Sequence, residues 1–89
     1  MDKEIISNCK KFIQDNDIDA LKEYSIELVS LNQEYGNWEY IFQQVYLHAC
    51  LKKRKDVAEW LTSLYNEFDP IDQIALRQTF AYGKYLLNK

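Results

Sequence analysis

Apolar residues recur three and four positions apart along most of the chain, the spacing that gathers side chains on one face of an α-helix. The clearest example is the segment 56–68, in which one apolar stripe is separated from a polar face. This stripe consists of Val57, Trp60, Leu61, Leu64, Tyr65 and Phe68. Because Trp60 lies at its centre, we expect this side chain to be a main anchor of the core. The segment 2–14 shows the same pattern over a shorter length, and the sequence predicts an amphipathic helix in both.

Three further helices are predicted between and after these segments. The segment 18–32 has a narrow apolar stripe, whereas 37–51 and 70–87 carry apolar residues in nearly every direction around the helix axis. A helix that is apolar all round is a buried one. We therefore expect the helix at 37–51 to be buried, and the short turn around residue 54 to make it antiparallel to the helix that follows.

The predicted helix ends coincide with residues that favour caps and stops. Asn16 or Asp17 can cap the second helix, and Gly36 can adopt the left-handed conformation that ends it. Asp69 followed by Pro70 predicts the start of the last helix, with Asp69 as the cap and proline at the first helical position.

Composition supports an all-α fold in a single domain spanning residues 1–89. A chain of 89 residues with 47% apolar content can build one core, and two glycines and one proline are too few for many strands joined by tight turns. We therefore predict about five helices, arranged as antiparallel pairs over residues 2–32 and 37–68 with a final helix at 70–87.

The two predicted pairs are related by a weak internal repeat. Residues 19–22 align with residues 56–59 at an offset of 37 positions. A helix-pair period of about 33–40 residues is typical of solenoids, in which each pair buries its apolar face by stacking on the next. The sequence thus predicts a short stack of helix pairs.

Residues 49–61, with the sequence Ala-Cys-Leu-Lys-Lys-Arg-Lys-Asp-Val-Ala-Glu-Trp-Leu, carry a resemblance to a known family. They resemble the ankyrin-like helical repeats of large DNA viruses, in which an Ala-Cys pair ends one helix and a basic turn leads into the next. Lys53 and Arg54 stand where those repeats usually have Gly-His, and the Thr-Pro-Leu-His start of full ankyrin repeats is absent. The resemblance covers residues 41–66 best. It implies an all-helical, protein-binding scaffold of viral origin and implies no catalyst.

Net charge and cysteine content limit which functions and cellular locations we expect. The net charge of −3 provides no overall basic field for nucleic acid or anionic lipid, and no apolar run approaches the ~20 residues of a membrane span. Two cysteines make no disulfide framework, and no signal peptide follows Met1. We expect a cytoplasmic protein, located in the host cytoplasm or virion if it is viral.

No convincing catalytic or metal-binding set is found. His48 is the only histidine, and Cys50, two positions away on the same helix, points in a different direction. The acidic run 15–19 resembles the start of a calcium loop, but Ala20 replaces the required glycine and Ile26 the required glutamate. We therefore expect no catalytic residue, no metal ligand and no cofactor, and a protein that is not an enzyme.

Two surfaces remain as candidates for binding. The final helix has more apolar residues than one interface can cover, so we predict a partner-binding face at Tyr82, Tyr85 and Leu86, serving either a homodimer or another protein. The alternative is a helical nucleic-acid-binding protein that uses the basic turn Lys52-Lys53-Arg54-Lys55. The same cations also suit a solvated helix C-terminus, where they complement the helix dipole.

Overall fold

The computed structural model describes residues 2–31 and 38–89, which form five α-helices and no strand. The helices are α1 (Asp2–Gln14), α2 (Ile18–Leu31), α3 (Trp38–Leu51), α4 (Lys55–Asn66) and α5 (Pro70–Asn88). The predicted all-α class is confirmed, and the helix ends that the structure describes agree with the predicted ones to within two residues. The predicted stop at Gly36 lies outside the described residues. None of the helices in the described ranges has both the length and the apolar character to cross a membrane.

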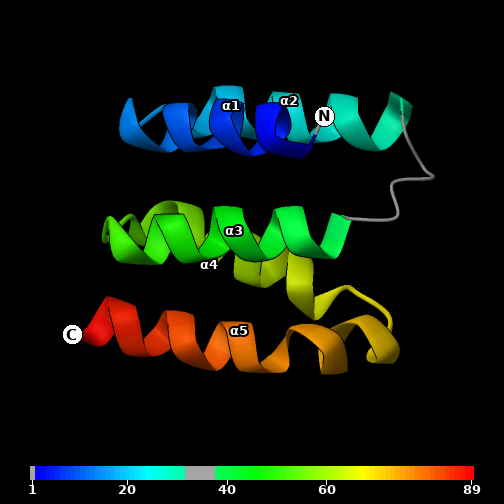
Figure 1. The fold of residues 1–89 in the computed structure, drawn as a ribbon, viewed down its shortest axis with the longest axis vertical. Coiled ribbons are helices and arrows are strands. Elements are labelled where there is room, and N and C mark those ends of the chain that lie inside the picture. The colour runs from blue at the N-terminus through cyan, green and yellow to red at the C-terminus, as the bar shows by residue number, and fades with distance from the viewer. Residues whose placement is uncertain (1, 32–37) are drawn as a thin grey trace.

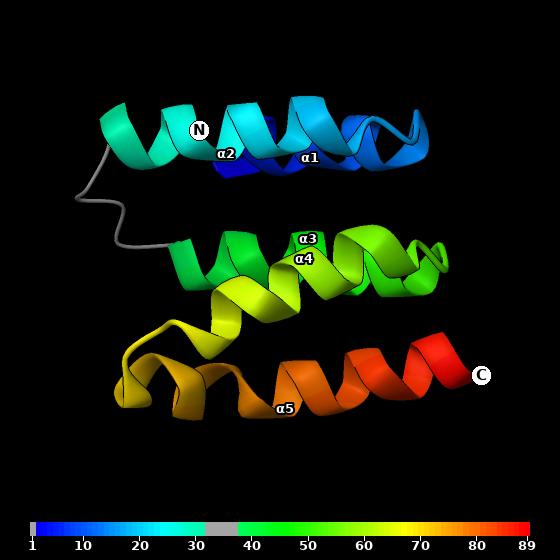
Figure 2. The ribbon, with the colours of Figure 1, turned by 180° about the vertical axis from the view of Figure 1, so that it is seen from behind.

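The helices are arranged in two layers (Figure 1). Helices α1, α3 and α5 lie side by side in one layer and run in the same direction, with α3 in the middle, while α2 and α4 run the opposite way in a second layer behind them (Figure 2). We call these the three-helix layer and the two-helix layer. Each helix of the second layer packs against the helix that precedes it, and α3 contacts α1, α4 and α5.

The turns after α1 and after α3 have the same hydrogen-bond pattern at an offset of 37 residues. Each is a Schellman motif, with backbone N–H groups of Asn16 and Asp17 donating to the carbonyls of Ile13 and Phe12 in the first turn, and those of Lys53 and Arg54 donating to Cys50 and Ala49 in the second. Asn16 and Lys53 both adopt the left-handed conformation, with φ of 59° and 61°. Lys53 thus occupies a conformation that favours glycine, and the two turns coincide residue by residue at the predicted offset.

The centre of the core is an aromatic cluster between α3 and α5. Tyr46, only 1% exposed, stacks on Phe80 with ring centroids 4.1 Å apart, and Tyr65 of α4 also stacks on Phe80, with ring centroids 4.0 Å apart. Gly83 makes this close approach feasible, because a Cβ at that position would lie 2.2 Å from a ring carbon of Tyr46 and 2.9 Å from the sulfur of Cys50. The glycine therefore sets which face of α5 rests on α3.

Trp60 is less central than the sequence suggests. It is only partly buried, and the ammonium group of Lys22 in α2 lies 5.7 Å from the centre of its ring. The deeply buried residues of α4 are its neighbours in the sequence: Val57, Ala58 and Leu61. The apolar stripe of α4 is wider than its contact with α3, so Trp60 falls on the flank that faces α2, and the prediction of a central anchor was wrong.

The start of α5 confirms one half of its predicted cap. Asp69 is the N-cap residue, with extended backbone, and Pro70 takes the first helical position as expected. However, the Asp69 side chain forms no capping hydrogen bond. Gln73 instead joins the helices: its side-chain amide donates to the carbonyls of Tyr65, Asn66 and Phe68 at the end of α4. The α4–α5 corner is thus stabilised from the first turn of α5.

Candidate functional site

The most prominent surface feature is an apolar stripe along the exposed side of α5. Ile71 is 80% exposed, Ile74 63%, Tyr82 53% and Tyr85 60%. Their spacing of three, eight and three residues places all four on one helical face, with the exposed Gln78 in the middle. We call this face, completed by the exposed Ala75 and Ala81, the α5 stripe.

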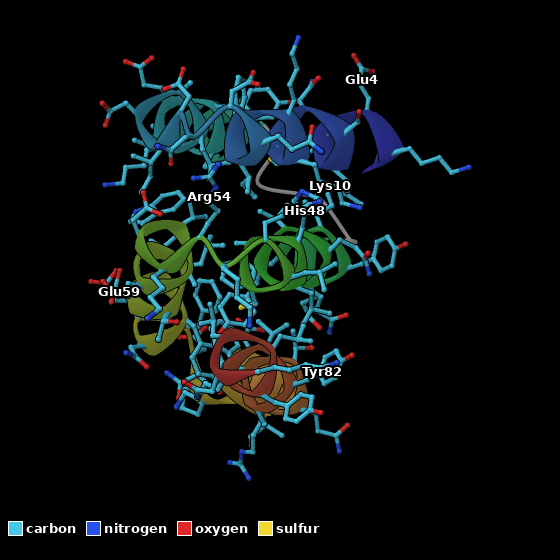
Figure 3. All side chains as sticks on the ribbon, turned by 90° about the vertical axis from the view of Figure 1, so that its left-hand side faces the viewer. Glu4, Lys10, His48, Arg54, Glu59 and Tyr82 are labelled. Carbon is cyan, nitrogen blue, oxygen red and sulfur yellow. The ribbon has the colours of Figure 1, made fainter. Side chains whose placement is uncertain are left out.

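Two of the three predicted partner-binding residues belong to this stripe. Tyr82 and Tyr85 stack on each other with ring centroids 6.2 Å apart, and Tyr82 projects from α5 on the side away from α4 (Figure 3). Rigid, amphipathic tyrosine side chains are enriched in protein interfaces. Their stacked arrangement places two such side chains next to each other on the α5 stripe.

The prediction that Leu86, the third residue, binds a partner is corrected by the structure. Only 8% of its surface is exposed, and it belongs to the core with Phe80. Residue 86 follows Gly83 by three positions and so shares the face that rests on α3. Its side chain is not available to a partner in this structure.

Ile71 and Ile74 belong to the α5 stripe, although the sequence prediction of a partner-binding face does not include them. Both are among the apolar residues of the segment 70–87, for which the sequence analysis does not separate core from surface. The available signal was their phase: Ile71, Ile74, Gln78, Tyr82 and Tyr85 follow one another at intervals of three and four. A second stripe in the same helix, through Leu76, Phe80 and Gly83, competes with it, and the Tyr46–Gly83 contact decides which of them is buried.

The basic turn Lys52-Lys53-Arg54-Lys55 is partly engaged within the fold. The ammonium group of Lys53 donates to the backbone carbonyl of Leu86, and Arg54 Nη2 donates to the carbonyl of Gln14 at 3.5 Å. These carbonyls lie at the C-terminal ends of α5 and α1, which meet the end of α3 at one edge because the three helices are parallel (Figure 1). Cations at this edge complement the negative dipole ends of the helices whose carbonyls they contact, α5 and α1. Lys52 and Lys55 are exposed.

Both cysteine thiols are buried, and the imidazole of His48 is partly buried. Burial raises the pKa of the Cys9 thiol to about 11 and also raises the pKa of Cys50, so both thiols stay protonated at neutral pH. The pKa of His48 is lowered by burial and then by the charges of Lys10 and Lys52, and Lys10 lies next to it between α1 and α3 (Figure 3). In residues 2–31 and 38–89, no cluster of three or more His, Cys, Asp and Glu side chains could hold a metal ion.

An open groove of about 350 Å³ lies between α4 and the end of α5. Most of its lining residues are polar by type, but its wall surface is mostly apolar, and Thr62 and Ser63 turn their hydroxyl groups to carbonyls of their own helix. Asn88 likewise donates to the carbonyl of Lys84. The groove is open to solvent and part of its polar lining is bonded within its own helices, which makes it a weaker candidate than the α5 stripe.

Comparison with known proteins adds no assignment: the sequence matches no family model, and neither the curated proteins nor the solved structures give a significant match.

Proposed function

We propose that this protein is a non-catalytic interaction module, a short stack of antiparallel helix pairs that binds a protein through the α5 stripe. The observation that carries the proposal is the stripe itself. Four large apolar residues that are more than half exposed lie on one face of a single helix, and exposed apolar surfaces of this kind usually mark interaction sites.

The matching turns support the stacked-pair part of the proposal. In addition to the coincident turn hydrogen bonds, Ser25 donates to the carbonyl of Leu21 as Thr62 does to that of Ala58, again 37 residues later and at the same distance of 2.8 Å. Two helix pairs that share this much local geometry favour a repeat architecture of the ankyrin-like type. On the resemblance of residues 49–61 alone, we also propose a viral protein acting in the host cytoplasm or virion.

Affinity capture with matched variants tests the proposal. The tagged chain and its Ile74→Glu variant are used as baits in the same native extract, with Ser7→Glu on the exposed side of α1 as a control that adds the same charge elsewhere. We expect a protein recovered by the wild type and by Ser7→Glu to be lost with Ile74→Glu, while circular dichroism shows equal helix content. Recovery of the same proteins by all three baits, or of none by any, would contradict the proposal.

The alternative, nucleic-acid binding through the basic turn, has less support, because the side chains of Lys53 and Arg54 already bind helix-end carbonyls. Fluorescence anisotropy with duplex and single-stranded oligonucleotides at ~50 mM salt is the decisive measurement, since phosphate contacts are strongest at low salt. Binding that the double variant Lys52→Glu, Lys55→Glu abolishes would revive this alternative.

A further inference from the structure

The α5 stripe is symmetric about its central residue, Gln78. Ile71 and Tyr85 lie seven positions before and after it, Ile74 and Tyr82 lie four positions before and after it, and Ala75 and Ala81 lie three. All seven residues are exposed. At 1.5 Å per residue, the stripe is about 21 Å long from Ile71 to Tyr85. Read from either end, this helical face therefore presents large apolar and small side chains in the same order.

Such a face is complementary to itself when two copies run antiparallel. A two-fold axis through Gln78 brings Ile71 level with Tyr85 of the second copy and Ile74 level with Tyr82. It also sets the large side chains of one helix beside the small alanines of the other, because Ala75 and Ala81 lie within a turn of Ile74 and Tyr82. Alternation of large and small residues is what allows two helices to approach closely.

The charges of α5 favour the antiparallel direction over the parallel one. Asp69 and Asp72 lie at its N-terminal end, and Lys84 and Lys89 lie at its C-terminal end. An antiparallel pair places each acidic end beside a basic end and also brings opposite ends of the helix dipoles together. A parallel pair would bring like charges together at both ends. Arg77, next to the centre, is turned by about 100° from Gln78 and so lies on the flank.

We propose that the partner of the α5 stripe is a second copy of this chain, bound through an antiparallel α5–α5 contact with its two-fold axis at Gln78. This inference rests on the proposed function and names its partner. The structure supplies the exposed face, the symmetry of its residues and the charge asymmetry of the helix, and together these specify both the occupant and the register.

Sedimentation equilibrium of the purified chain at micromolar concentrations tests self-association. We expect a dimer for the wild type and for the α1 control Ser7→Glu. Tyr85→Glu and Ile74→Glu should raise the dimer Kd by about a hundredfold or more, because each substitution places a carboxylate twice in one apolar contact. Circular dichroism should show unchanged helix content in both, since both side chains are exposed in the single chain.

Disulfide cross-linking tests the register. Under mild oxidation the Gln78→Cys variant should cross-link to itself, whereas Ile71→Cys should not, because its two copies would lie about 21 Å apart. A mixture of Ile71→Cys and Tyr85→Cys should cross-link to each other. The native Cys9 and Cys50 are buried and do not compete. Self-cross-linking of Ile71→Cys would indicate a parallel pair and overturn the proposed register.

A monomeric wild type would overturn the proposed self-association and leave the interaction module standing, provided that affinity capture recovers a different protein whose binding Ile74→Glu abolishes. Failure of that capture together with a monomeric chain would reject both. A dimer that neither glutamate variant weakens would place the contact elsewhere and would likewise overturn the α5–α5 pairing.

Discussion

Helices α1 and α5 flank α3 in the three-helix layer, yet they expose different kinds of side chain to solvent. Each contributes a nearly inaccessible residue to the core, Ile13 at 1% exposure and Leu76 at 0%. On their outer faces, however, α1 exposes only polar side chains among its described positions, which are Lys3, Glu4, Ser7, Lys11 and Gln14, whereas α5 exposes the stripe. Equal burial on the inner faces meets the needs of the fold, so the apolar surface of α5 requires a different explanation, and binding provides one.

The largest expected effect is on stability, and it tests whether the buried faces of α1 and α5 stabilise the fold equally. Ile13→Ala and Leu76→Ala should each lower the free energy of unfolding by about 2–5 kcal/mol, because each removes a fully buried side chain and leaves a cavity. Urea denaturation monitored by circular dichroism gives both values. Ile74→Ala is the matched control on the outer face and should change stability by only about 0.5 kcal/mol when measured on the monomer. A loss as large as that of Leu76→Ala would show that the stripe is buried within a single chain.

Gly83 sharpens the comparison because α1 makes its contact with α3 without a glycine. Gly83→Ala should destabilise the protein by about 1–3 kcal/mol, since the added methyl group would overlap the ring of Tyr46. The measurement is again chemical denaturation. In the background of Tyr46→Leu, which removes the ring, the same substitution should cost much less. An equal cost in both backgrounds would contradict the proposed contact.

The two helix-start aspartates should differ in the same assay. Asp17 accepts a hydrogen bond from the backbone N–H of Ala20 at 3.1 Å, so Asp17→Ala should cost about 1 kcal/mol. Asp69 makes no such bond, and Asp69→Ala should cost less. Asp17→Asn, which keeps the acceptor, should retain most of the stability. Equal losses for the two alanine variants would mean that Asp69 caps α5 in solution.

The environment of His48 between α1 and α3 predicts that the free energy of unfolding depends on pH. Its pKa in the folded protein is lowered by burial, with Lys10 and Lys52 adding to the effect, and among the described residues its Nε2 has no hydrogen-bond partner. The unfolded chain therefore takes up a proton first, near pH ~6.5, and stability should fall as the pH decreases below that value. Denaturation midpoints at pH ~7.5 and ~5.5 measure this. His48→Gln should show a smaller difference, and an identical difference in both proteins would exclude His48 as the cause.

The helices and their ends could be predicted because their signals are local. Asp17 and Pro70 mark helix starts by their own chemistry, and the spacing of apolar residues identifies helical faces without reference to the rest of the chain. Depth is not a local property. Trp60 and Leu61 are neighbours in one stripe, and only the contact between α4 and α3 determines that Leu61 is fully buried while Trp60 is partly buried.

The α5 stripe was predicted only in part for the same reason. In a helix that is apolar nearly all round, Leu86 and Ile74 are equivalent candidates until packing separates them. The separation depends on the close approach of Gly83 to Tyr46, residues 37 positions apart in the chain. The contact of Lys53 with the carbonyl of Leu86 is equally non-local, because it exists only where α5 lies parallel to α3.

The two buried cysteines have a practical consequence for measuring motion. Cys9 lies in the first helix pair and Cys50 in the second, and neither thiol can meet a reagent in water while its pair is closed. The rate at which each thiol is labelled therefore reports the opening of the contacts that cover it, which for Cys50 include its contact with α5 at Gly83. Equal rates would mean that the molecule opens as one cooperative unit, whereas a faster Cys9 would mean that the first pair detaches while the second stays folded on α5. The labelling rates of Cys9 and Cys50 thus measure the opening of the two parts of the molecule separately.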